Sequence, residues 1–104
     1  MKGIHWHGDT RKVARALSEQ TKSLLGHELH KLQLGLMPSD WKPMKSIGPG
    51  VCEIRIHADG EFRAVYLAEF DSRVHVLHVF RKKSRKTSRS DIDIARRRYR
   101  TLMH

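Results

Sequence analysis

Residues 51–80 read VCEIRIHADGEFRAVYLAEFDSRVHVLHVF, and most of their apolar side chains recur with the two-residue period of β-strands. Asp59-Gly60 is a dipeptide typical of tight hairpin turns. Asp71-Ser72-Arg73 marks a second turn between two apolar segments. We therefore predict a three-strand antiparallel meander, whose last strand, Val74–Phe80, is apolar enough to be central.

The two faces of this meander differ in character. On the first strand, Cys52, Ile54 and Ile56 share one face. The second strand extends that apolar face with Phe62, Ala64, Tyr66, Ala68 and Phe70. The opposite face mixes apolar and ionisable side chains, namely Val51, Glu53, Arg55, His57, Arg63, Val65 and Leu67.

The residues before the meander predict a short strand and two helices. Ile4 and Trp6 alternate with polar residues, as on a half-buried strand. Asp9 or Thr10 is placed to cap a first helix, and Ser18 to cap a second. The second helix has an apolar stripe of Leu25, Leu29, Leu32 and Leu36, and it is expected to end near Gly35 and Pro38. Residues 37–50 contain all three prolines and no period, so we predict a loop.

The residues after the meander predict a basic segment and a final helix. Residues 81–89, RKKSRKTSR, carry six positive charges in nine positions and add nothing to a core. Ser90 and Asp93 resemble a capping box with Asp in place of Glu. The helix then has one apolar stripe, formed by Ile92, Ala95, Tyr99 and Leu102.

The elements together predict a single α+β domain over residues 1–104, with an N-terminal strand and helical hairpin, the meander, and a C-terminal helix. We expect the helices to pack against one face of the sheet. The other face would then carry Arg55, Arg63 and the segment 81–89. Normal sheet twist would make that face a concave basic surface.

The amino-acid composition limits the classes of partner and the cellular location that we expect for this protein. The chain has 21 lysines and arginines against 11 acidic residues, a net charge of +10 at pH 7. Such an excess indicates a polyanionic partner, and nucleic acid fits better than a membrane because no broad apolar helix face lies opposite the basic residues. Cys52 is the only cysteine, which predicts a reducing compartment. Because there is no apolar run of about 18 residues and no apolar signal segment in Met1–Gly8, we expect a cytoplasmic protein.

The eight histidines do not suggest a metal site. His75 and His78 should point to opposite faces of their strand, and no acidic or cysteine partners cluster near them in the sequence. His5 and His7 lie on one face of a short strand and are expected to have no catalytic role. We therefore interpret the histidines as surface or packing residues.

Three stretches resemble the RelE/HigB superfamily of toxin–antitoxin toxins, and specifically its phage-derived HigB-like branch. They are LQLGLMPSDWKPMKSIGPGVCEIRI (32–56), GEFRAVY (60–66) and VHVLHVFRKKSRKTSRSDIDIARRRY (74–99), and the resemblance extends from about Leu24 onward. It implies a RelE-like fold and a ribosome-dependent endonuclease activity on mRNA. It also implies a cognate antitoxin with a helix-turn-helix DNA-binding domain.

The resemblance also implies roles for individual residues. Arg63 matches the arginine that the family uses near the scissile phosphate. Arg55 lies on the strand where relatives carry basic catalytic residues, and Lys82 or Lys83 matches a second basic residue after the last strand. Glu53 stands where relatives can carry lysine. The loop after Phe80 has no tyrosine, whereas some relatives stack one on a base there, so the general base is left open.

RNA cleavage without a metal or other cofactor needs a base for the 2′-hydroxyl, a cation for the phosphorane and an acid for the leaving 5′-oxygen. Arginine suits the second task, which we assign to Arg63 assisted by Arg55. Glu53 or His57 is the candidate base, and Lys82 or Lys83 serves as acid or base if nearby positive charge lowers its pKa. The product would end in a 2′,3′-cyclic phosphate. We expect mRNA and rRNA on the ribosome to contact Lys42, Lys45, Arg81, Arg85, Lys86, Arg89 and Arg97.

Two other functions remain open. ParE-like proteins share this architecture and inhibit DNA gyrase by binding it. A basic module that binds nucleic acid without cleaving it would use the same surface. The basic residues around Arg63 and Lys82 favour RNA cleavage, and the cutting of transcripts within codons would separate the three.

Overall fold

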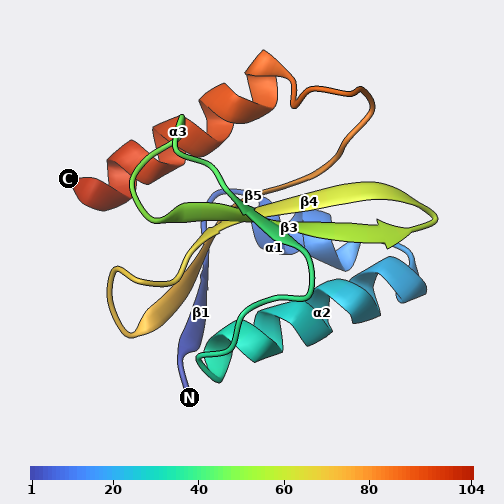
Figure 1. Cartoon of the computed structure of the whole chain (residues 1–104), viewed down its shortest axis with the longest axis horizontal. Coiled ribbons are helices and arrows are strands. Elements are labelled where there is room, and N and C mark those ends of the chain that lie inside the picture. The colour runs from blue at the N-terminus through green and yellow to red at the C-terminus, as the bar shows by residue number, and fades with distance from the viewer.

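The computed structural model describes all residues, 1–104, as five strands and three helices (Figure 1). No helix is both long and apolar enough to cross a membrane. The α+β class and the order of the predicted elements are confirmed. The elements are β1 (Gly3–Trp6), α1 (Thr10–Arg15), α2 (Glu19–Gln33), β2 (Trp41–Pro43), β3 (Val51–Ala58), β4 (Gly60–Leu67), β5 (Arg73–Arg81) and α3 (Arg89–Met103).

The predicted meander forms the centre of one sheet in the order β1-β5-β4-β3-β2. β1 pairs parallel with β5, and every other pair is antiparallel. The prediction of a loop throughout residues 37–50 is wrong at β2, where Trp41 pairs with Ile54. β2 leaves no period in the sequence because it has only three residues, all of them exposed, and ends in a proline.

α1 and α2 cover one face of the sheet, as predicted. The apolar faces of β3 and β4 pack there against the leucine stripe of α2, and Ile4 and Trp6 of β1 contact the same cluster. Burial of these side chains supplies the main driving force for packing the helices on the sheet. The cluster comprises Ala14, Leu25, Leu29, Leu32, Ile54, Ile56, Ala64, Tyr66, Ala68, Val74, Val76 and Val79.

α3 packs on the opposite face, so the prediction that all helices share one face is wrong (Figure 1). Its predicted apolar stripe is confirmed, because Ala95 is fully buried and its neighbours on the stripe pack against the sheet. α3 can pack on this face because the face is apolar where β3 begins and β4 ends. The sheet residues in this smaller cluster are Val51, Val65, Leu67, Leu77 and Phe80.

Serines cap both long helices. The Ser18 hydroxyl accepts a hydrogen bond from the Thr21 N–H at 3.3 Å, as the sequence predicts. The cap of α3 is Ser88, which accepts from the Asp91 N–H at 3.1 Å, so the prediction of Ser90 is wrong by two residues. Both serines are followed three positions later by an aspartate, and the sequence pattern does not distinguish them.

The end of α2 is partly as predicted. Gly35 has a φ of +80° and follows the last turn, where a residue without a Cβ avoids the strain of this conformation. Leu36 lies beyond the helix and is exposed, so it does not belong to the apolar stripe as predicted.

A β-bulge changes the predicted direction of one histidine. Val65 pairs with His78 and Tyr66 pairs with Val76, so Leu77 is an extra residue on β5. His78 Nε2 therefore contacts Asp91 of α3 at 2.7 Å. His75 is on this same side of the sheet. It contacts His7, and His7 points away from α2 because Ile4 and Trp6, with which it alternates, face α2. The prediction that His75 and His78 point to opposite faces is wrong, since strict alternation cannot anticipate a bulge.

Candidate functional site

A charged cluster lies on the side of β3 and β4 that faces α3 and the segment 81–89. Arg55 and Arg63 are directly paired across the two strands, and Glu53 lies two residues before Arg55 on the same face. Glu53 Oε1 is 3.4 Å from Arg55 Nε and 3.9 Å from Arg63 Nε. The carboxylate therefore sits between two guanidinium groups. Alternation along β3 predicted that these side chains share a face, and the structure brings them together.

The three members of this cluster differ in their access to solvent. The side chains of Glu53 and Arg63 are 4% and 7% exposed, whereas that of Arg55 is 32% exposed. Arg63 is further held by Glu61 at 3.3 Å and by the Phe62 carbonyl, which accepts from its Nη1 at 3.0 Å. Arg55 is thus the more accessible of the two guanidinium groups, and Arg63 is the buried one.

Two buried atoms of the cluster have no hydrogen-bond partner in the protein, Oε2 of Glu53 and Nε of Arg63. Leaving such a group unsatisfied costs about 1–3 kcal/mol, so native proteins rarely retain one without a use for it. Oε2 of Glu53 is therefore a buried lone-pair acceptor that no protein group satisfies.

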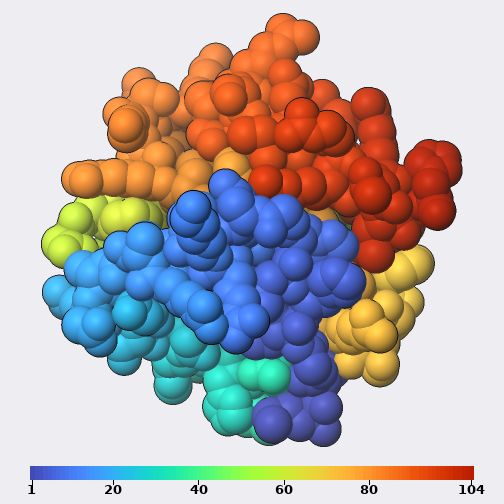
Figure 2. Space-filling model, turned by 180° about the vertical axis from the view of Figure 1, so that it is seen from behind, coloured from blue at the N-terminus to red at the C-terminus, as the bar shows by residue number.

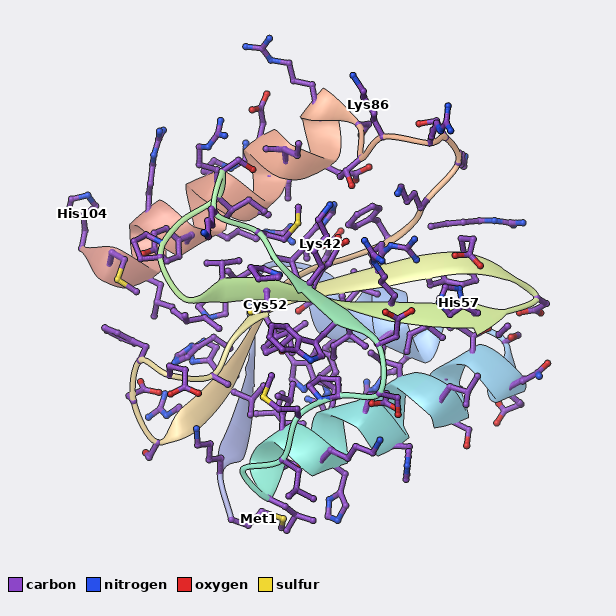
Figure 3. The ribbon with its side chains drawn as sticks, viewed as in Figure 1. Met1, Lys42, Cys52, His57, Lys86 and His104 are labelled. Carbon is purple, nitrogen blue, oxygen red and sulfur yellow. The ribbon has the colours of Figure 1, made fainter.

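Glu53 lines a groove of about 370 Å³ between β2, the segment 81–89 and the start of α3. Figure 2 shows, at one edge of the molecule, the yellow-green tip of the β3–β4 hairpin beneath the orange segment 81–89. Figure 3 shows Lys42 on β2 and Lys86 on the loop before α3, two of the side chains that flank the groove. The groove combines one acidic side chain with five basic ones, Lys42, Lys45, Lys82, Arg85 and Lys86.

The other residues predicted for the site are less central. Lys83 lines a neighbouring hollow of about 290 Å³, which it shares with Lys82 and Lys86. Arg81 also lines this hollow, but its guanidinium lies 5.8 Å from the centre of the Phe62 ring, on the side of α2. Arg89 and Arg97 are exposed on α3 and line neither hollow.

His57, which is labelled in Figure 3, contacts two acidic residues near the β3–β4 hairpin. Its Nε2 donates to Asp40 at 2.7 Å and its Nδ1 donates to Glu61 at 2.8 Å. These hydrogen bonds raise the pKa of His57, first through Asp40 and then through Glu61. Because both ring nitrogens face carboxylate oxygens, these contacts favour the protonated form, in which both nitrogens donate.

Glu61 and Asp40 were not identified from the sequence as part of the site. Glu61 links the two halves of the charged network, because it contacts both His57 and Arg63. Its pairing with His57 arises because Ala58 pairs with Gly60, whereas a two-residue turn at Asp59-Gly60 would have paired Ala58 with Glu61. Asp40 has no signal in the sequence, because it precedes the unpredicted strand β2.

We expect His57 to stabilise the fold at low pH. A pKa raised on folding means that the stabilisation is fully present below the unfolded value of 6.5 and is lost as pH rises through the folded value. His57→Gln should therefore lower Tm more at about pH 5.5 than at about pH 9. Thermal unfolding of both proteins at the two pH values tests this, and a Tm difference that grows toward alkaline pH would contradict it.

A second cluster, of three histidines, lies where β1 meets β5. His5 and His7 stack with their ring centres 4.3 Å apart, and His7 Nε2 is 3.0 Å from His75 Nδ1. Burial, and then the charges of His5, His75 and Arg98, lower the pKa of His7 to about 4, so this ring is uncharged at neutral pH. The sequence analysis placed His5 and His7 together on one face but did not bring His75 to them.

Residues 12–100 match a family model described as "Phage derived protein Gp49-like (DUF891)". The match begins in α1 and includes both the Glu53 groove and the segment 81–89. It leaves His5 and His7 outside the matched residues. Comparison with curated proteins finds no match.

Proposed function

The chain belongs to the Gp49-like family of phage-derived proteins, a type of toxin in toxin–antitoxin systems, and we propose that it is a RelE/HigB-like toxin that cleaves mRNA on the ribosome. The observation that carries this proposal is the position of Glu53. Its carboxylate is buried between two guanidinium groups at a groove that five lysine and arginine side chains line. A phosphodiester satisfies the basic side chains, and a 2′-hydroxyl satisfies Oε2.

The proposed reaction is an attack within the RNA strand. Glu53 takes the proton of the 2′-hydroxyl, and the 2′-oxygen bonds to the adjacent phosphorus while the bond to the 5′-oxygen breaks. Arg55 binds the non-bridging oxygens and stabilises the charge that they gain. Lys82, which lines the groove with Glu53, donates a proton to the leaving 5′-oxygen. The products are a 2′,3′-cyclic phosphate and a 5′-hydroxyl.

The geometry favours a division of labour between the two arginines. Arg55 contacts the phosphate because its side chain is accessible. Arg63 is a positioning residue, because it is buried against Glu61, Glu53 and the Phe62 carbonyl and so fixes the strand face on which the carboxylate stands. This division of roles differs from the sequence analysis, where the family resemblance assigned the phosphate contact to Arg63.

The ribosome supplies what the groove lacks. A groove with few catalytic groups depends on an mRNA that is already bent, so that the 2′-oxygen is aligned with the phosphorus, and such orientation is worth about 7–11 kcal/mol in favourable cases. Basic side chains outside the groove, such as Arg89 and Arg97, would contact rRNA phosphates. A neutralising antitoxin would cover the same region with acidic side chains.

Inhibition of DNA gyrase by binding is the alternative that shares this family resemblance. Gyrase inhibition gives no role to the buried carboxylate of Glu53, whose Oε2 has no partner. Simple RNA binding gives it no role either, because a negative charge in the groove opposes the binding of RNA. Both alternatives leave the basic groove as a contact surface only. The presence of Glu53 among the basic residues therefore favours cleavage.

Ribosomes programmed with mRNA provide the test. We expect the protein to cut the mRNA within codons when ribosomes are present, and to leave the same free RNA intact. Arg55→Ala should slow cleavage by about 10²-fold or more, because the phosphorane loses its accessible cation. Arg15→Ala removes an exposed arginine of α1, far from the groove, and should leave the rate unchanged. Intact mRNA accompanied by DNA damage in growing cells would instead support gyrase as the target.

A further inference from the structure

We propose that His5, His7 and His75 form a binding site for a divalent metal ion of the zinc type, at the junction of β1 and β5. One ring nitrogen from each histidine lies within 4.8 Å of the other two. Neutral imidazole is a preferred ligand of Zn²⁺, and three histidines with an open fourth position form a known type of site. The inference is independent of RNA cleavage.

The sheet pairing places the three ligands. His5 lies directly opposite His75 in the parallel pair of β1 and β5, and His7 continues the same face beyond the end of β1. All three side chains therefore project from one side of the sheet. The nitrogens of His7 and His75, 3.0 Å apart, are already near the separation that two ligands of one tetrahedral ion require, since each lies about 2.0–2.1 Å from the metal.

Asp71 gives His75 the orientation that a metal ligand needs. Nε2 of His75 donates to Asp71 at 2.9 Å, which leaves the lone pair on Nδ1, the nitrogen that faces His7. A carboxylate that holds the far nitrogen of a ligating histidine is the usual outer contact of zinc sites, and it makes the imidazole a better donor. His75 is itself buried, with its side chain 2% exposed, so its orientation is fixed by packing as well.

The charges around the cluster are balanced enough to accept a cation. Arg98 is paired with Asp9 at 3.0 Å, and Asp71 adds a negative charge beside His75. Arg73 approaches His5 Nδ1 at 3.3 Å, but its side chain is at the exposed edge and moves away at little cost. His5 also lines an open groove of about 650 Å³ beside β1, which gives an ion a path to the site.

The site is remote from the RNA groove. Glu53, which lines the groove, pairs with Val65 of β4, and Val65 pairs with His78 of β5. The two places are therefore two strands and three positions of β5 apart, or roughly 10 Å across the sheet and roughly 10 Å along it. A metal here therefore joins the four-residue edge strand β1 to its neighbour β5 and takes no part in the cleavage step.

Isothermal titration calorimetry, in which ZnCl₂ is added to the metal-free full chain, tests the site. We expect one ion per chain, and CoCl₂ in its place should give the visible absorption of a tetrahedral complex. His5→Gln and His7→Gln should each weaken binding at least 10-fold, and Asp71→Asn by roughly 10- to 100-fold. The double variant His27→Gln/His30→Gln removes two exposed histidines of α2 and should bind as the wild type does.

The variants at His5 and His7 alter side chains that are not part of either core, so each should keep the wild-type Tm in the absence of metal. The rise in Tm that zinc produces in the wild type should be lost in both. The inference is overturned if zinc at about 1 mM does not bind, or if binding survives unchanged in both variants.

Discussion

Glu53→Gln is expected to slow ribosome-dependent cleavage by roughly 10²- to 10⁴-fold, the range that general-base catalysis contributes. The amide has nearly the same shape as the carboxylate and fits the same space beside Arg55 and Arg63. It cannot accept the 2′-hydroxyl proton, however, and its loss of charge removes the partner of both guanidinium groups. Single-turnover cleavage of mRNA on stalled ribosomes measures the effect directly, without contributions from product release.

The matched control for this substitution is Glu69→Gln, which removes one carboxylate at an exposed position outside the groove. It should cleave at the wild-type rate. Ribosome binding by Glu53→Gln should be retained or strengthened, because the groove gains a unit of positive charge. A Glu53→Gln protein that still folds and cleaves within a few-fold of the wild type would remove Glu53 from the mechanism and return the role of base to another residue.

Arg63→Ala is expected to be the most destabilising substitution at the site. The guanidinium is 7% exposed and bonded to Glu61 and the Phe62 carbonyl, and it lies 3.9 Å from the buried Glu53. Removing one partner of a buried pair leaves an uncompensated charge, at a cost of about 3 kcal/mol or more. For a chain of this length the Tm should fall by roughly 10–20 °C.

Arg55→Ala provides the comparison in the same assay. Its side chain is 32% exposed and its contact with Glu53 is 3.4 Å, so its loss should cost at most about 1 kcal/mol. Replacing both members of the buried pair, in Glu53→Leu/Arg63→Leu, should recover part of the stability lost in Arg63→Ala, because no buried charge is then left alone. Equal loss of Tm in Arg55→Ala and Arg63→Ala would contradict the distinction between an accessible and a positioning arginine.

Much of the fold follows from periodicity. The two-residue alternation in residues 51–80 correctly placed Glu53, Arg55 and Arg63 on one face, because successive side chains of a strand point to opposite faces of the sheet. The 3.6-residue stripes of α2 and α3 were also correct in their main members. These patterns are local, and each indicates which side chains of a strand or helix pack against another element.

What the sequence does not specify is which neighbour covers a face. Periodicity identified the buried stripe of α3 but not the side of the sheet on which it packs, and so an open sheet surface was expected where a second layer lies. For the same reason, Arg63 was expected to be accessible. Its side chain is instead 7% exposed and contacts Glu61 and the Phe62 carbonyl, which its place in the alternation does not indicate.

The histidine cluster was not predicted because it depends on a long-range strand pairing. Parallel pairing brings β1 beside β5 across 70 residues of chain, so that His5 lies opposite His75. The spacing of the histidines carries no signal for this pairing. The bulge at Leu77 is a separate feature, which changes only the side to which His78 points.

The chemical end of the RNA fragment is the most direct measure of the proposed reaction. If Glu53 activates the 2′-hydroxyl beside a phosphate that Arg55 holds, the upstream fragment cut on the ribosome must carry a 2′,3′-cyclic phosphate, and the downstream fragment a 5′-hydroxyl. Mass spectrometry of the fragments reads both ends in one experiment. An upstream fragment that ends in a plain 3′-hydroxyl would show that water, and not the 2′-oxygen, attacks the phosphorus, and would contradict the proposed function of the groove.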